Sequence, residues 1–232
     1  RAGRASRRRT RTGRSTLVTG TKGQDGLLAP EQVLHRAADR LAQQFAGMVN
    51  AETVERVVFE SFTALARTAT VSVHVLSLAE KFARDRLTAL AQSRGLIAKP
   101  VPEILYVCVQ NSGRSQMAAA ITRHLAGDRV HIRSAGSQPG PGILPEVVEV
   151  LAEVGIEVGE EYPKPLTDDV VRAADAVVTM GCGDACPFYP GKRYLDWDLS
   201  DPAELDLDGI RRVRDDIRTR VEMLLGELAP TS

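Results

Sequence analysis

The stretch ILYVCVQNSGRSQMA, residues 104–118, decides the fold class of this chain. Its first four residues are apolar and predict a buried strand, and an Ala-rich segment that predicts a helix begins near Ser115. A short loop between a strand and a helix can curl so that its backbone N–H groups converge on one point, and the helix adds the positive end of its dipole. The stretch therefore predicts a nucleophilic Cys108 in an oxyanion-binding loop.

The residue types in this loop suit that chemistry. Arg114 supplies a planar, permanently charged fork that matches a tetrahedral oxyanion. The same positive field favours the reactive thiolate of Cys108, and Ser115 can donate a hydrogen bond to the sulfur. A small buried cysteine at a strand end is the alternative, but the match follows a strand, contains a glycine and opens a helix. The predicted oxyanion-binding residues are Val109, Gln110, Asn111, Ser112, Gly113, Arg114 and Ser115.

The region from Glu103 onward alternates between strand and helix patterns. Strands separated by helices predict an α/β domain, with a central parallel sheet that helices cover on both faces. Ligands in such sheets bind beyond the carboxyl ends of the strands, where the loop after Cys108 lies. The expected strands are 103–109, 130–135, 176–180 and 192–196, and the expected helices are 115–126, 144–154, 167–173 and 207–227.

The region before this domain has helical apolar spacing throughout. It predicts an all-α three-helix bundle over 30–95, with helices over 31–45, from Asn50 as N-cap, and from about Val71 or Ser77 to 93. Gly95 is expected to end the last helix. Residues 96–102, with two prolines, are expected to form a linker to a catalytic domain over 103–232.

The first 29 residues form a basic tail. Residues 1–22 contain seven Arg, one Lys and no acid, although the whole chain has a formal net charge of zero. Such a segment cannot bury apolar surface, so we expect it to be disordered. We expect it to be either an inert tail or an artefact of the chosen start of the sequence. A contact with nucleic acid and an organelle-targeting segment are the alternatives. The chain has no apolar run long enough for a membrane span, so we expect a soluble, cytoplasmic protein.

The chain has three cysteines, an odd number that argues against a disulfide framework and for thiol chemistry in a reducing compartment. Cys182 and Cys186 follow an apolar strand, and Gly181 and Gly183 on either side of Cys182 allow loop movement. A zinc site needs four ligands, and neither His35 nor His74 has a partner at ligand spacing, so we expect no metal and no cofactor. Three thiols are the number that a relay needs, with a nucleophile, an attacking thiol and a resolving thiol.

A carboxylate after the last strand could protonate a leaving oxygen as general acid. Asp196, Asp198 and Asp201 compete for this role, and the sequence does not choose between them. Each could also be a solvated charge or a helix cap. Asp201 in particular precedes Pro202 and could be an N-cap.

Together, Cys108 to Ala118, Cys182 with Cys186-Pro187, and Asp201-Pro202 resemble the thioredoxin-coupled arsenate reductases, which have the low-molecular-weight protein tyrosine phosphatase fold. The resemblance covers about 103–228. It implies that Cys108 attacks arsenate, that Arg114 and the loop amides hold the oxyanion, that Asn111 braces the loop, and that Asp201 is the acid. A preceding three-helix module resembles that of actinobacterial members.

The resemblance also implies the order of the relay. Cys182 attacks the arsenic adduct of Cys108, arsenite leaves, and Cys186 then attacks Cys182 to form a disulfide that thioredoxin reduces. The segment between Cys182 and Cys186 is shorter than in better-known members, so its movement must differ in detail. A phosphatase is the closest alternative function, but it would need neither Cys182 nor Cys186. A thiol-based arsenic sensor is a more distant one, because chelation would not require Arg114.

Overall fold

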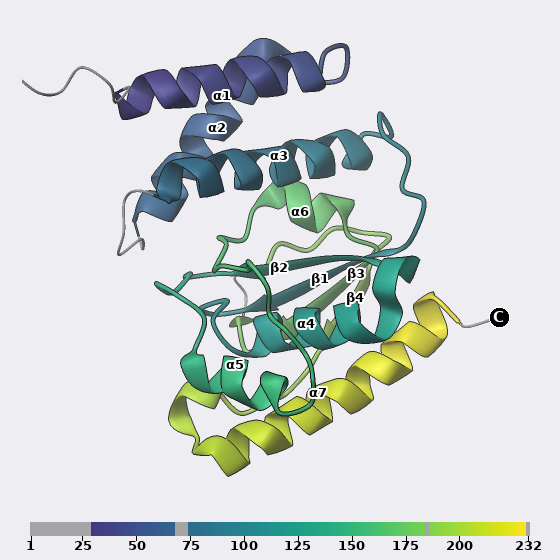
Figure 1. Cartoon of the computed structure of the whole chain (residues 1–232). Helices are drawn as coiled ribbons and strands as arrows, with labels where there is room; N and C mark the ends of the chain where they lie inside the picture. The colour runs from purple at the N-terminus through teal and green to yellow at the C-terminus, as the bar shows by residue number, and fades with distance from the viewer. Residues whose placement is uncertain (1–28, 68–73, 184–185, 231–232) are drawn as a thin grey trace, which may run out of the picture.

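The computed structural model describes residues 29–67, 74–183 and 186–230. The predicted basic tail, apart from its last residue, lies outside the described residues, and so does the alternative helix start at Val71. Three N-terminal helices lie above an α/β domain built on one sheet (Figure 1). Within the described part of the chain, no helix combines the length and the apolar character that crossing a membrane requires.

The sheet confirms the predicted fold class. Its four strands run parallel in the order β2-β1-β3-β4, and each begins and ends within about two residues of the predicted bounds. From β1 the chain crosses to one neighbour, β2, and later to the other, β3. The carboxyl ends of β1 and β3 therefore form the topological switch point at which open α/β sheets bind ligands. The strands are β1 (Glu103–Cys108), β2 (His131–Gly136), β3 (Ala176–Met180) and β4 (Arg193–Asp196).

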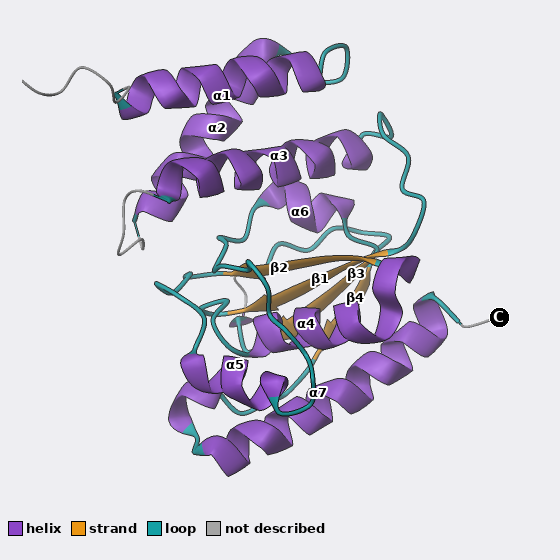
Figure 2. Cartoon of the chain, in the orientation of Figure 1, coloured by secondary structure: helices purple, strands orange, loops and turns teal. Residues whose placement is uncertain are grey.

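Helices cover both faces of the sheet (Figure 2). One face carries α4 (Arg114–Ala126), α5 (Pro145–Ala152) and α7 (Leu207–Leu228), and the other carries α6 (Asp168–Ala173) and α3 (Val75–Ser93). The connections in the described residues include two short 3-10 helices, η1 (Gly127–Arg129) and η3 (Pro202–Glu204).

Strand β1 is buried on both sides, as the near-continuous apolar pattern predicts. Tyr106 and Cys108 share a core with α4 and α7, whereas Leu105 and Val107 share another with α6. Successive side chains of a strand point to opposite faces, so this alternation aims the Cys108 side chain at the α4 face. The predicted nucleophile is thus directed toward the helix that follows its own loop.

The N-terminal helices are α1 (Pro30–Gln44), α2 (Ala51–Ala66) and α3. Asn50 caps α2 as predicted, because its Oδ1 accepts a hydrogen bond from the Thr53 amide at 2.8 Å. The three helices share a core that includes Leu41, Val58 and Leu87.

Helix α3 has a second buried face that its apolar spacing does not predict. Ala89 on this face belongs to the same core as Leu105 of the sheet. The small Ala89 side chain allows α3 to lie close to this core, whereas Ala83 and Leu87 belong to the core of the three helices. Helix α3 is therefore shared between the helical region and the α/β domain.

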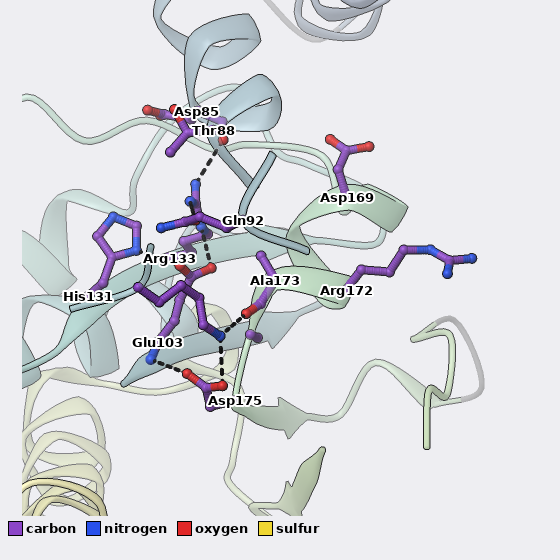
Figure 3. A network of polar contacts seen from close by, with 12 residues as sticks. Asp85, Thr88, Gln92, Glu103, His131, Arg133, Asp169, Arg172, Ala173 and Asp175 are labelled. Carbon is purple, nitrogen blue, oxygen red and sulfur yellow. Dashed lines mark hydrogen bonds and ion pairs between the residues drawn. The ribbon is translucent and has the colours of Figure 1, made fainter. Parts of the chain in front are cut away.

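A network of charged groups also joins α3 to the sheet (Figure 3). Arg133 of β2 donates from Nε to Glu103 Oε1 at 2.7 Å, and its two terminal nitrogens donate to the Asp85 carbonyl at 3.1 Å and to Gln92 Oε1 at 3.3 Å. The Arg86 Nε of α3 lies 2.9 Å from Asp169 Oδ2. Paired charges satisfy the polar groups buried between the two regions.

Candidate active site

Cys108 is the last residue of β1 and is buried. Its sulfur lies 3.0 Å from Ser115 Oγ and accepts a hydrogen bond from the Asn111 amide at 3.2 Å. Both contacts hold the sulfur in place between the loop backbone and the first turn of α4.

The residues from 108 to 116, here called the nucleophile loop, comprise the loop after β1 and the first residues of α4, and they are held from outside. Four of their carbonyl groups accept hydrogen bonds of 2.8–3.1 Å from backbone amides in the 137–144 segment. The described peptides are trans, so the N–H group of each such peptide points opposite to its carbonyl. The Gln110–Asn111 peptide demonstrates this, since its carbonyl faces Gly140 and its N–H faces Cys108 Sγ. The four carbonyls belong to Cys108, Val109, Gln110 and Ser112.

The nucleophile loop lies very close to the backbone of Gly136, and Asn111 within it has an unusual backbone conformation. A Cβ atom at Gly136 would lie 2.7 Å from the Val109 carbonyl oxygen, so only glycine fits beside the loop. Asn111 is the one non-glycine residue with positive φ among those described, at 51°. Asparagine tolerates this left-handed conformation better than most residues do.

The Asn111 side chain organises the interior of the loop. Its Nδ2 donates to Ser115 Oγ at 2.8 Å, which leaves the Ser115 proton free to be donated to Cys108 Sγ. Its Oδ1 accepts from Gln116 Nε2 at 3.2 Å and from the Lys164 amide at 2.8 Å. The amide orientation is thus fixed at both ends.

Arg114 is the first residue of α4 and is 8% exposed. Its two terminal nitrogens donate to Asp201 Oδ2 at 2.5 Å and to the Leu199 carbonyl at 3.3 Å. Its Nε is buried and has no hydrogen-bond partner in the described part of the molecule. An oxyanion above Cys108 would supply the acceptor that this buried donor lacks.

Of the three candidate acids, Asp201 is the one whose side chain reaches the loop. Its Oδ2 contacts Arg114, and its Oδ1 accepts from the Ala203 amide at 3.1 Å, so it is also the predicted N-cap before Pro202. Asp196 instead accepts from Thr179 at 2.6 Å. The geometry therefore favours Asp201 for proton transfer at this site.

The other two cysteines lie beyond the neighbouring strand, in residues 181–187, here called the relay loop. Cys108 pairs in register with Met180, the last residue of β3, and Cys182 follows two positions later. All three cysteines are free thiols. Burial raises the pKa of Cys182, with a smaller contribution from the charge of Cys108, and burial raises the pKa of Cys186 to about 11.

Gly181 brings the relay loop against the nucleophile loop. It has a φ of +74°, and a Cβ there would lie 3.0 Å from an Arg114 terminal nitrogen. No hydrogen bond joins Cys186 to the nucleophile loop in the described residues, where its sulfur has a weak 4.0 Å contact to the Pro187 carbonyl. The structure thus assembles Cys108, Arg114 and Asp201 directly, with Cys182 at the adjacent strand end and Cys186 further along its loop.

Two contributors to the site were missed from the sequence. Lys164 and Tyr162 reach the nucleophile loop through their backbones, so their side chains give no motif. The Tyr-Pro-Lys-Pro run over 162–165 was the available signal, because two prolines stiffen an extended segment. Among the described residues, no group of three or more His, Cys, Asp or Glu side chains is placed to hold a metal ion.

Two protein-family models match the chain. Residues 34–91 match the protein-tyrosine-phosphatase-like, N-terminal domain, and residues 103–231 match the low molecular weight phosphotyrosine protein phosphatase family. The first match covers most of α1, α2 and α3, and the second covers the sheet and both cysteine-bearing loops.

Some relatives match most of the chain, and others match about half of it. The structure of a Corynebacterium glutamicum thioredoxin-dependent arsenate reductase is 48% identical, with a TM-score of 0.80 over 86% of this chain and 98% of that one. A Halobacterium salinarum relative is 37% identical over 130 residues, which are 54% of this chain and 92% of the relative. Arsenate reductase 1 of Staphylococcus epidermidis is 35% identical over 123 residues, 51% of this chain and 92% of the relative. The chain belongs to the low molecular weight phosphotyrosine protein phosphatase family.

Proposed function

We propose that this protein reduces arsenate to arsenite, with Cys108 as nucleophile and with an intramolecular disulfide relay through Cys182 and Cys186. The observation that carries the proposal is the pair Cys182 and Cys186, which follows the strand that neighbours Cys108. The Corynebacterium glutamicum relative, named as a thioredoxin-dependent arsenate reductase, supports it at 48% identity. Hydrolysis of a phosphate ester would give Cys182 and Cys186 no role.

In the first step the Cys108 thiolate attacks arsenic and forms a sulfur–arsenic bond. The bond between arsenic and one arsenate hydroxyl breaks, and the hydroxyl leaves as water after it takes one proton from Asp201. The Arg114 fork and the loop amides bind the remaining arsenate oxygens. The buried Arg114 Nε, which lacks a partner, is one donor available for this purpose.

In the second step the Cys182 thiolate attacks Cys108 Sγ. A Cys108–Cys182 disulfide forms, and the sulfur–arsenic bond breaks with its electron pair on arsenic, which leaves as arsenite. The two thiolates thereby supply the two electrons of the reduction. Cys186 then attacks Cys182, which frees Cys108 and leaves a Cys182–Cys186 disulfide.

An external dithiol must then reduce the Cys182–Cys186 disulfide. Thioredoxin fits this role, because its own thiol pair can exchange with a disulfide in two steps and release it reduced. Such recycling requires a reducing compartment, so we place the protein in the cytoplasm. In this scheme the reaction uses no metal and no bound cofactor, and nucleic acid and membrane are not partners.

Steady-state NADPH consumption tests the proposal, measured with arsenate, thioredoxin and thioredoxin reductase. Wild type is expected to consume NADPH only when arsenate is present, and Cys182→Ser is expected to lose that turnover. The Cys182→Ser variant keeps Cys108, Arg114 and Asp201, so it is the matched control for oxyanion chemistry. Hydrolysis of an aryl phosphate by both proteins, without arsenate-dependent turnover, would instead identify a phosphatase.

A further inference from the structure

We infer that Tyr162 is a positioning residue through which helix α3 holds the nucleophile loop in its reactive arrangement. The residue lies in the 161–165 segment, between the N-terminal helices and the start of α4. Its side chain contacts the helices and its backbone contacts the loop, so it connects two regions that the sequence separates widely.

The Tyr162 side chain is anchored on α3. It packs against a buried apolar cluster of α2 and α3, and its hydroxyl donates to the Leu78 carbonyl at 3.4 Å. Burial raises the pKa of Tyr162, with smaller contributions from Asp85 and Glu161, so the hydroxyl keeps its proton and remains a donor. The cluster comprises Leu65, Val75, Ala79 and Phe82.

The backbone around Tyr162 contacts the nucleophile loop at two points. The Tyr162 carbonyl accepts from Gln116 Nε2 at 3.1 Å, and the Lys164 amide donates to Asn111 Oδ1 at 2.8 Å. Pro163 and Pro165 fix the φ angles next to these contacts, so the segment is stiff. A displacement of the Tyr162 ring therefore moves both contacts together.

The contacts continue to the reacting sulfur. Gln116 and the Lys164 amide hold the Asn111 amide, which donates to Ser115 Oγ at 2.8 Å, and Ser115 Oγ lies 3.0 Å from Cys108 Sγ. If the Asn111 side-chain amide turns, its Nδ2 no longer donates to Ser115 Oγ. The Ser115 hydroxyl proton is then no longer directed at Cys108 Sγ. The thiolate then loses a hydrogen bond, although no residue that touches it has been changed.

The test measures thiolate reactivity, and it rests on the proposed function only in taking Cys108 as the nucleophile. The rate of alkylation of Cys108 by iodoacetamide is followed by peptide mapping at pH 6.5 and pH 9.0, in wild type and in Tyr162→Leu. In Tyr162→Leu the ratio of the rate at pH 6.5 to that at pH 9.0 is expected to fall about tenfold, because a hydrogen bond to a charged sulfur is lost.

Two further variants separate positioning from general loosening. Tyr162→Phe keeps the ring and is expected to restore most of the wild-type ratio. Arg86→Gln removes a charge that joins α3 to Asp169, which lies away from the nucleophile loop contacts, and is expected to leave the ratio unchanged. If Tyr162→Leu does not fold, Tyr162→Met, with a flexible side chain that fills more of the space, takes its place.

A wild-type ratio in a folded Tyr162→Leu or Tyr162→Met would overturn the inference. An equal fall in Arg86→Gln would also overturn it, because the effect would then come from any loosening of α3. Alkylation requires no arsenate, so a protein without arsenate turnover that still shows the expected ratios would refute the proposed function alone.

Discussion

The nucleophile loop and the relay loop leave neighbouring parallel strands at the same edge of the sheet, but they are built differently. In the nucleophile loop, four carbonyls, the Cys108 sulfur and the Asn111 amide all have hydrogen-bond partners. In the relay loop, Gly181 and Gly183 have positive φ, and the hydrogen bond of the Cys186 sulfur among the described residues is a weak one of 4.0 Å. One loop is preorganised, and the other has the composition of a loop that can rearrange.

The difference follows from the two kinds of chemistry. An oxyanion is stabilised best by donors that are already in place, because nothing then has to reorganise during the reaction. A disulfide relay needs sulfurs that come into bonding distance in turn, and Cα atoms of bonded cysteines lie within about 7 Å. Cys182 must approach Cys108 in one step and Cys186 in the next, so a rigid relay loop would block the cycle.

The largest effect is expected when the nucleophile loop loses the Arg114 guanidinium. Arg114→Lys keeps the positive charge but removes the second donor arm and Nε. The rate of the first chemical step, measured as single-turnover consumption of arsenate, is expected to fall about 10³-fold. A loss of less than tenfold would mean that the loop amides, and not Arg114, bind the oxyanion.

A smaller effect is expected for the acid. Asp201→Asn keeps a side-chain oxygen that can cap η3 but removes the proton donor, and it should slow the same step about 10²-fold. Oxyanion binding, measured by phosphate titration, should change little by comparison. An unchanged single-turnover rate would move the acid role to Asp198 or Asp196.

The relay loop is expected to respond to pH. Burial raises the pKa of Cys186 to about 11, so its thiol is protonated at neutral pH and its thiolate fraction increases as pH increases. The smaller contribution from Cys182 disappears once Cys182 is part of a disulfide, but burial remains. Conversion of the Cys108–Cys182 disulfide to Cys182–Cys186 should therefore become about tenfold faster per pH unit. Quenched, peptide-mapped samples from pH 6.5 to 8.5 measure it, and a rate independent of pH would contradict the burial of Cys186 during the attack.

The smallest effect is expected where the two loops touch. Gly181→Ala and Gly183→Ala both strain a left-handed backbone, but only the Cβ at 181 would crowd Arg114, whereas the Cβ at 183 meets nothing within 4 Å among the described residues. The first chemical step should slow about fivefold in Gly181→Ala, through a displaced guanidinium, and remain within about twofold of wild type in Gly183→Ala. Equal rates in the two variants would show that the relay loop does not position Arg114.

The sequence was sufficient for the elements that local patterns encode. The buried strand before Cys108, the helix that begins at Arg114 and the Asn50 cap depend on neighbouring residues, and they lie within about two residues of the predicted positions. The contact between Ser115 and Cys108 also follows from local geometry, since Cys108 ends the strand and Ser115 lies in the first turn of the helix of the same strand–loop–helix unit.

Contacts between distant segments could not be predicted in the same way. The second buried face of α3 depends on Ala89, a residue type that carries little hydrophobic signal, and on a partner helix, α6, that lies far along the chain. The family resemblance implied Asp201 as the acid, but a choice of Asp201 over Asp196 from the residues themselves required the position of Arg114. The contacts of Tyr162 and Lys164 run through backbone groups that every residue has.

The most direct test of the rigid-loop and relay-loop account is peptide mapping of Cys186→Ser after one equivalent of arsenate, without thioredoxin. The variant keeps the nucleophile, its loop and Cys182, but it lacks the resolving thiol. One equivalent of arsenite and a trapped Cys108–Cys182 disulfide are expected. Arsenite release with all remaining thiols free, or recovery of unreacted arsenate, would contradict it.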